Sequence, residues 1–212
     1  ADKNKDRAFA VLWMANLPHK AHDDSRPGDQ QWYYTEVPAL DAKGRPTGGK
    51  ERGSLASNMR YLDHLLGQLR DGLKERGLSN RTILFFTADN GTADIRGNNS
   101  GMDKGSYDRD DAIRVPFVVG GGPVKPRGAS EVLVDFTDFW PTFAQLAGYC
   151  GPMNTDGLSL APYFLGQPFT PREIIRMEMN NARWVRDQDW LLDGRGRFYD
   201  TRGPRTGKST GT

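Results

Sequence analysis

Hydrophobic residues recur every three or four positions through one segment of the chain, and this spacing predicts an amphipathic helix. The positions are 4, 3, 4, 3 and 4 residues apart, so they fall on one helical face; they are Leu55, Met59, Leu62, Leu66, Leu69 and Leu73. Ser54 precedes the stripe and can cap the first turn through its hydroxyl. Gly77 follows it and can adopt the left-handed conformation that ends many helices. The pattern therefore predicts a helix between Ser54 and Gly77.

Short, dense apolar runs predict buried strands on both sides of this helix. Phe9–Met14 is one such run and Thr82–Ala88 is another, and unbroken apolar runs are typical of strands in a parallel sheet. A strand, a crossover helix and a second strand form a βαβ unit, whose two strands are parallel. Val115–Val119 predicts a third strand, with Pro116 near its start, where proline is tolerated.

The remaining segments predict smaller elements. Asn16–Gly53 is a polar stretch with four prolines, too long for an ordinary connection, and is expected to be a functional excursion. Glu131–Val134 predicts a short strand, and Asp138–Ala147 predicts a helix with a proline in its first turn and a glycine after its end. Beyond Met153, short runs alternate with glycine-containing turns, which predicts a small antiparallel sheet. These runs are Arg183–Arg186, Trp190–Leu192 and Arg197–Tyr199.

Together these elements predict an α/β fold with a mainly parallel sheet flanked by helices, followed by a small C-terminal antiparallel sheet. We expect residues 1–150 to belong to the α/β domain, residues 151–200 to form the antiparallel subdomain, and residues 201–212 to be a frayed tail.

Composition excludes several classes of protein. The 212 residues include 29 basic and 27 acidic side chains, for a net charge of +2, so nothing favours a nucleic acid or a membrane surface as partner. No apolar run approaches the ~18 residues of a membrane-spanning helix. The single cysteine excludes an internal disulfide framework and a zinc cluster built on cysteines.

Polar residues with catalytic potential follow the first two predicted strands. Pro18-His19 comes after the first run, and Asp89-Asn90 directly follows the second. Ligands of open α/β sheets bind at the carboxyl ends of strands, so neighbouring parallel strands would bring these side chains to one edge. Asp and Asn oxygens suit Ca²⁺ or Mg²⁺, and Lys104 in the next loop can meet an anionic group. The set predicts a site that cleaves a phosphate or sulfate ester, although each motif alone is more typical of a turn or loop.

A series of motifs, in order, resembles the sulfatase family of the alkaline phosphatase superfamily. The clearest is Asn80–Gly91, NRTILFFTADNG, which follows the leucine-striped helix. Phe9–His19 is similar to the family's strand that ends in Pro-His, and residues 183–200 are similar to its C-terminal sheet. The other matching segments, in family order, are Lys104-Gly105-Ser106, Ile113–Phe117, Asp135–Thr142, Leu146–Gly148 and Asp156–Leu160.

This resemblance implies a sulfuric ester hydrolase. In such enzymes the Asp-Asn pair ligates calcium, which implies a Ca²⁺ site at Asp89 and Asn90, with Mg²⁺ as the alternative. The histidine of Pro-His, here His19, contacts the ester and assists the leaving oxygen, and the lysine of Lys-Gly-Ser, here Lys104, holds the sulfate. The implied substrate is a sulfated small molecule or glycan, and the implied location is periplasmic, secreted or lysosomal. The sequence does not indicate an oligomeric state.

The nucleophile motif of the family is missing from this sequence. The family nucleophile is a formylglycine made from the first residue of Cys/Ser-x-Pro-x-Arg, and it lies upstream of the region matched here. Cys150–Asn154 and Ser25–Asp29 approach this motif but lack its arginine. The resemblance thus implies the C-terminal half of a sulfatase, in which residues 1–150 belong to the catalytic domain, and a chain that is inactive alone.

Two other functions remain open. A phosphodiesterase or phosphonate hydrolase of the same superfamily would share the fold and the metal-binding edge. A non-catalytic anion- or glycan-binding module is the other, because the aromatic residues Trp32, Tyr33 and Tyr34 can stack on a sugar face. The sulfatase interpretation requires His19 and the Asp89-Asn90 pair to meet at one edge of the sheet.

Overall fold

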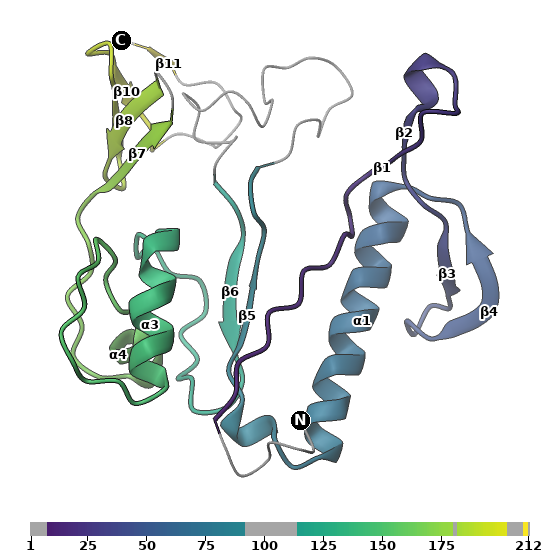
Figure 1. Ribbon diagram of the computed structural model, residues 1–212, viewed down its shortest axis with the longest axis horizontal. Helices are drawn as coiled ribbons and strands as arrows, with labels where there is room; N and C mark the ends of the chain where they lie inside the picture. Colours follow the sequence, from purple (N-terminus) through teal and green to yellow (C-terminus); the bar gives the residue numbers. More distant parts are fainter. Residues whose placement is uncertain (1–7, 92–113, 180–181, 203–209, 212) are drawn as a thin grey trace. The chain divides into compact units, whose positions relative to one another are not determined.

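The computed structural model of the protein describes residues 8–91, 114–179, 182–202 and 210–211 (Figure 1). The chain divides into two compact units, Ala1–Asn80 and Arg81–Thr212, and each is described by itself. No described helix combines the length and the apolar character that crossing a bilayer requires.

The described part of the first unit contains two hairpins and one long helix. The strands β1 (Ala21–His22) and β2 (Trp32–Tyr33) pair antiparallel, as do β3 (Val37–Leu40) and β4 (Pro46–Glu51). The polar excursion predicted for this part of the chain is therefore largely folded into hairpins. Helix α1 (Leu55–Glu75) follows β4.

Helix α1 begins and ends where its sequence predicts. The Ser54 hydroxyl accepts a hydrogen bond from the Ser57 backbone N–H at 3.0 Å, and the Ser57 hydroxyl accepts one from the Ser54 N–H at 2.8 Å. This reciprocal capping box satisfies two amide groups that the first turn would otherwise leave unpaired. Beyond the helix, Gly77 has a φ of 64°, the left-handed conformation expected there. Leu62 is buried, whereas Leu55 and other residues of the apolar stripe are more than a third exposed.

The second unit is built around a pair of antiparallel strands, β5 (Leu84–Thr87) and β6 (Phe117–Gly120). Helices α3 (Phe139–Leu146) and α4 (Ala161–Leu165) lie beside this pair (Figure 1). Phenylalanine rings from all four elements pack together with centroids 5.0 to 6.4 Å apart, within the range of stacked and edge-to-face aromatic pairs. These rings belong to Phe85, Phe117, Phe139, Phe143 and Phe164.

Two of the strand predictions are wrong. Phe9–Met14 pairs with none of the described residues, and its side chains are exposed, Val11 by 79% and Met14 by 81%. A strand requires a neighbour that satisfies its backbone groups, so this segment is extended but is not part of a sheet. The parallel βαβ pairing is consequently absent from the described chain, where the partner of β5 is the antiparallel β6. Glu131–Val134 contributes only one isolated bridge, between Leu133 and Arg172.

The C-terminal sheet is antiparallel, as predicted, with strand order β11-β10-β9-β8-β7. Its strands are β7 (Ile175–Met179), β8 (Ala182–Arg186), β9 (Trp190–Asp193), β10 (Phe198–Asp200) and β11 (Thr210–Gly211). The three predicted runs correspond to β8, β9 and β10, whereas β7 was not predicted. Thr210 and Gly211, within the segment expected to be a frayed tail, pair with β10. The domain boundary near residue 150 stays a prediction.

Candidate functional site

The carboxyl end of β5 carries the two predicted metal ligands. Asp89 is exposed and Asn90 is half-buried, and they lie two and three residues beyond the end of the strand at Thr87. The backbone N–H of Asn90 donates to Asp89 Oδ1 at 3.0 Å, and Asn90 Nδ2 donates to the carbonyl oxygen of Gly91 at 2.8 Å. These bonds hold two oxygen-bearing side chains next to each other in one turn.

Arg114 lies near this turn because of the way β5 and β6 pair. Leu84 is opposite Gly120, and Thr87 is opposite Phe117. Asn90 follows Thr87 by three residues and Arg114 precedes Phe117 by three, so both residues lie at the same end of the strand pair. Sequence reasoning did not select Arg114 as a site residue, because its position depends on the antiparallel pairing that was not predicted.

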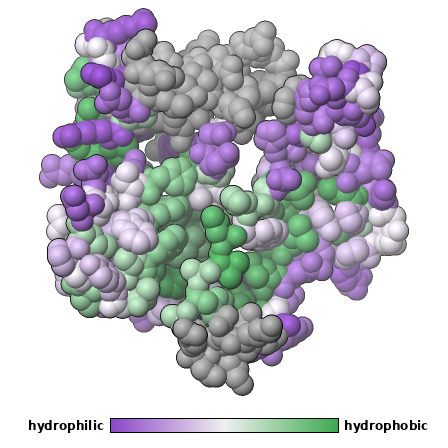
Figure 2. Space-filling model, in the orientation of Figure 1, coloured by the Kyte–Doolittle hydropathy of each residue, from purple (hydrophilic) through white to green (hydrophobic). Residues whose placement is uncertain are grey.

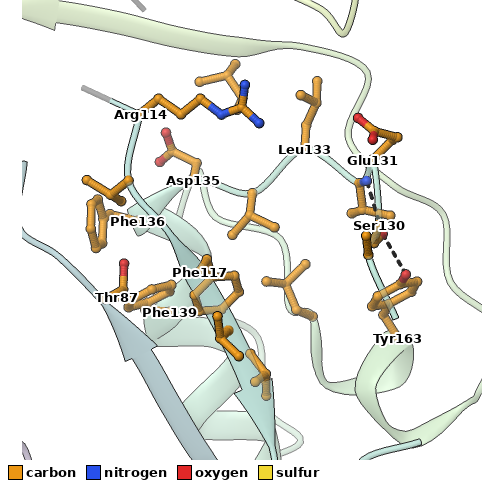
Figure 3. Close-up of a pocket in the computed structure, with 18 of the residues that line it drawn as sticks. Thr87, Arg114, Phe117, Ser130, Glu131, Leu133, Asp135, Phe136, Phe139 and Tyr163 are labelled. Carbon is orange, nitrogen blue, oxygen red and sulfur yellow. Dashed lines mark hydrogen bonds between the residues drawn. The ribbon is translucent and has the colours of Figure 1, made fainter. Parts of the chain in front are cut away.

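A pocket of about 1420 Å³ in the second unit includes Asp89, Asn90 and Arg114 in its lining. Figure 3 shows Arg114 and Asp135 at one end of the pocket. Much of the wall between its ends is hydrophobic and aromatic, and it includes Phe117, Phe136 and Phe139 (Figure 3). Figure 2 likewise shows hydrophobic residues gathered over β5, β6 and α3. The pocket therefore combines polar side chains with an apolar wall, as ligand-binding pockets commonly do.

A second polar group lies at the other end of the pocket. The hydroxyl groups of Ser130 and Tyr163 are hydrogen-bonded at 2.7 Å (Figure 3). The guanidinium of Arg127 lies 4.7 Å from the centre of the Tyr163 ring. Because these groups are engaged with one another, they are best understood as tying the loop before Val132 to α4.

The predicted catalytic residues His19 and Lys104 are not among the described residues of the unit that contains Asp89 and Asn90. His19 belongs to the first unit, in a turn before β1, where its side chain is exposed and its backbone N–H donates to the Asn16 carbonyl at 2.8 Å. Lys104 lies outside the described residues. The structure thus brings together the two predicted metal ligands, and the meeting of all four residues stays a prediction.

The side-chain oxygens of Asp89 and Asn90 are of the type that hard cations prefer as ligands. Calcium takes 6–8 oxygen ligands, and these two side chains offer a carboxylate and an amide oxygen. Within the described ranges, no three His, Cys, Asp or Glu side chains gather in one place as a metal centre would require. Asp89 and Asn90 could therefore supply only part of a calcium coordination shell.

Comparison with known sequences identifies the family. The sequence model of the Sulfatase family matches residues 1–149. Arylsulfatase A from Bos taurus is 30% identical over 174 residues, which cover 78% of this chain and 34% of that protein. N-acetylgalactosamine-6-sulfatase from Canis lupus familiaris is 30% identical over 177 residues, which cover 79% of this chain and 30% of that protein. The chain spans about a third of the length of these curated relatives.

Comparison with solved structures identifies the fold. The phosphonate monoester hydrolase SpPMH from Silicibacter pomeroyi superposes with a TM-score of 0.55 at 19% identity, covering 73% of this chain and 35% of that protein. At this identity the likeness concerns the fold alone, and it confirms the alkaline-phosphatase-like α/β class predicted from the sequence. Because the family's sequence model matches more than half of its residues, the chain belongs to the sulfatase family.

Proposed function

We propose that this chain contributes the calcium-binding and sulfate-binding part of a sulfuric ester hydrolase. The observation that carries the proposal is the Asp89-Asn90 pair at the end of β5, in the lining of a pocket large enough for a sugar or an aryl group. Membership of the sulfatase family supports the choice of a sulfate ester as the substrate.

Each proposed residue has a distinct task. Asp89 and Asn90 hold the cation, which when bound supplies positive charge to the sulfate oxygens. Lys104 adds a second positive charge for the same anion. His19 donates a proton to the leaving oxygen. Removal of a general acid commonly lowers the rate by about 10²–10⁴-fold.

The sequence lacks the nucleophile that this chemistry requires. None of its segments reads Cys/Ser-x-Pro-x-Arg, and Cys150 is followed by Gly-Pro-Met-Asn. We therefore propose that the 212-residue chain does not hydrolyse sulfate esters alone. The proposed substrate is a sulfated glycan or small molecule, since one relative is named for sulfated N-acetylgalactosamine. The family resemblance also favours a periplasmic, secreted or lysosomal location.

A calcium titration tests the metal site directly. Calorimetry of the chain with CaCl₂ should show one weak site, and the Asp89→Ala variant should lose it because the only carboxylate of the pair is gone. Asp156→Asn removes an exposed carboxylate of the same unit and is the matched control. Equal calcium binding by the wild-type chain and Asp89→Ala would contradict the assignment.

An activity assay tests the reaction. A protein that contains these residues together with a Cys/Ser-x-Pro-x-Arg segment should release p-nitrophenol from p-nitrophenyl sulfate, and His19→Ala should lower kcat by about 10²-fold or more. Phenyl phosphonate esters are assayed in parallel, because the fold is shared with a phosphonate monoester hydrolase. Turnover of the phosphonate alone would favour that second function, and hydrolysis of the sulfate by the 212-residue chain would show that no further nucleophile is needed.

A further inference from the structure

We propose that Arg114 binds the anionic group of the substrate and that Asp135 positions its guanidinium. This inference rests on the proposed function, because it assigns a further residue to the pocket that contains Asp89 and Asn90. Neither residue belongs to the set of ligands and catalytic groups that the family resemblance implies.

The backbone places Arg114 at the metal-binding turn. Arg114 precedes β6 by three residues, and Asn90 follows β5 by three residues at the same end of the antiparallel strand pair. Its side chain is exposed and forms part of the pocket lining, so a solute that enters the pocket can reach the guanidinium. Because Arg114 shares the pocket lining with Asp89 and Asn90, its charge attracts an anion that enters the pocket.

Asp135 is held rigidly at the same end of the pocket. Its Oδ1 accepts hydrogen bonds from the backbone N–H of Thr137 at 2.9 Å and from the Thr137 hydroxyl at 2.6 Å. These bonds cap the helical turn Phe136–Asp138 and fix the carboxylate. In Figure 3 the side chains of Arg114 and Asp135 lie near each other at this end. A carboxylate fixed near Arg114 attracts its guanidinium electrostatically, so Asp135 acts through Arg114.

The chemistry of a guanidinium suits a sulfate ester. The planar group presents five N–H donors, so it can face a carboxylate on one edge and still offer two parallel donors to the oxygens of an anion. The apolar wall formed by Phe117, Phe136 and Phe139 can accept the face of a sugar or an aryl ring. The substrate class is therefore a sulfate ester whose organic group has an apolar face.

Binding of a sulfated sugar tests the inference without any reaction. NMR titrations of the 212-residue chain compare N-acetylgalactosamine 6-sulfate with N-acetylgalactosamine. We expect Arg114→Gln to weaken binding of the sulfated sugar about tenfold, or 1.4 kcal/mol, and to leave the unsulfated sugar unchanged. Arg114→Lys keeps the charge but loses the paired donors, so its loss should be smaller. Asp135→Asn keeps a side-chain oxygen that can accept the capping hydrogen bonds, and it should also weaken binding of the sulfated sugar alone.

Arg176→Gln is the matched control, because Arg176 is exposed and lines the same pocket at the C-terminal sheet. Its affinity for both sugars should equal that of the wild-type chain. Equal affinities for Arg114→Gln and the wild-type chain, equal losses in Arg114→Gln and Arg176→Gln, or no preference of the wild-type chain for the sulfated sugar would each overturn the inference. If thermal unfolding shows that Arg114→Gln does not fold, Arg114→Lys provides the same comparison.

The outcome is separable from that of the proposed function. The titration measures binding without turnover and without added calcium. Failure of the hydrolysis assay would thus leave a sulfate preference dependent on Arg114 intact, whereas unchanged binding in Arg114→Gln would overturn this inference and leave the proposed hydrolysis in place.

Discussion

The carboxylate of Asp138 is completely buried and forms an ion pair with the guanidinium of Arg172, 34 residues later in the chain. The same carboxylate accepts hydrogen bonds from the backbone N–H groups of Asp135 at 2.9 Å and Leu158 at 2.7 Å. One side chain therefore joins the start of α3 to two later segments that lead toward the C-terminal sheet.

Replacing Asp138 by alanine should strongly destabilise the protein. The substitution leaves the largely buried Arg172 cation and the Leu158 N–H without their acceptor, and breaking a buried pair in this way commonly costs about 3–5 kcal/mol. Urea unfolding followed by circular dichroism measures the change. Asp156→Asn alters an exposed carboxylate and should stay within about 0.5 kcal/mol of the wild-type chain. If Asp138→Ala lowered the free energy of unfolding by less than about 1 kcal/mol, the ion pair would not be a major contribution to stability.

Gly157→Ala should disrupt the same junction by steric overlap. A Cβ atom at Gly157 would overlap the carbonyl oxygen of Thr137, and backbone atoms cannot give way as a flexible side chain can. We expect a loss of about 1–3 kcal/mol, typical of overpacking, in the same unfolding experiment. Gly67→Ala is the control, because a Cβ at this α1 position meets nothing within 4 Å and alanine favours the helix. The argument would fail if Gly157→Ala were as stable as Gly67→Ala.

A comparison of α1 with the Asp138–Arg172 pair shows which structural features can be predicted from the sequence alone. Helix α1 was predictable because its capping serine, its apolar spacing and its terminal glycine act within a few residues of one another. The sequence around Arg172 does not indicate that this residue pairs with Asp138, since the contact depends on how segments far apart in the chain pack. Strand β7 (Ile175–Met179) was not predicted for the same reason, because so short a segment is recognisable as a strand only through its pairing with β8.

The residues of the candidate site likewise include some that local sequence predicts and one that depends on long-range pairing. The adjacent residues Asp89 and Asn90 were recognisable as hard ligands from their type and their position after an apolar run. Arg114 was not recognisable, because its place at the same end of the strand pair as Asn90 follows from the antiparallel pairing of β5 and β6. The prediction of a parallel strand at Phe9–Met14 was wrong because a run of apolar residues does not specify a partner strand, and none of the described residues pairs with this segment.

Asn58→Asp should destabilise the first unit although the two side chains have nearly the same shape. Asn58 is completely buried, and with its amide nitrogen facing two carbonyl oxygens it donates to Thr35 O at 3.1 Å and to Ser54 O at 3.2 Å. An aspartate would place a buried charge against two acceptors, so we expect a loss of about 3 kcal/mol or more. Asn58→Ala removes the donors without adding charge and should cost about 1–3 kcal/mol. Equal stabilities of Asn58→Asp and the wild-type chain, measured by urea unfolding, would contradict this hydrogen-bond assignment.

Stability at low pH should depend on Asp193, a buried carboxylate at the end of β9. Burial by itself raises the pKa of Asp193, but hydrogen bonds from the backbone N–H and guanidinium of Arg197 at 2.9 and 2.6 Å, from the Arg195 N–H and from the Tyr199 hydroxyl outweigh it and lower the pKa to about 2. In the unfolded chain an aspartate has a pKa of about 3.9.

The sign of the pH dependence follows from these two values. Because folding lowers the pKa, the ionised Asp193 stabilises the fold above about pH 4, and this stabilisation is lost as the pH falls toward about 2. Asp193→Asn cannot ionise, so the gap between its urea midpoint and that of the wild-type chain should be constant near neutral pH and should narrow between about pH 4 and about pH 2. Asp200, whose pKa is also lowered to about 2 by the Arg202 side chain, is present in both proteins and therefore does not contribute to the gap. A gap that stays constant throughout the acid range would show that the charge of Asp193 does not stabilise the C-terminal sheet.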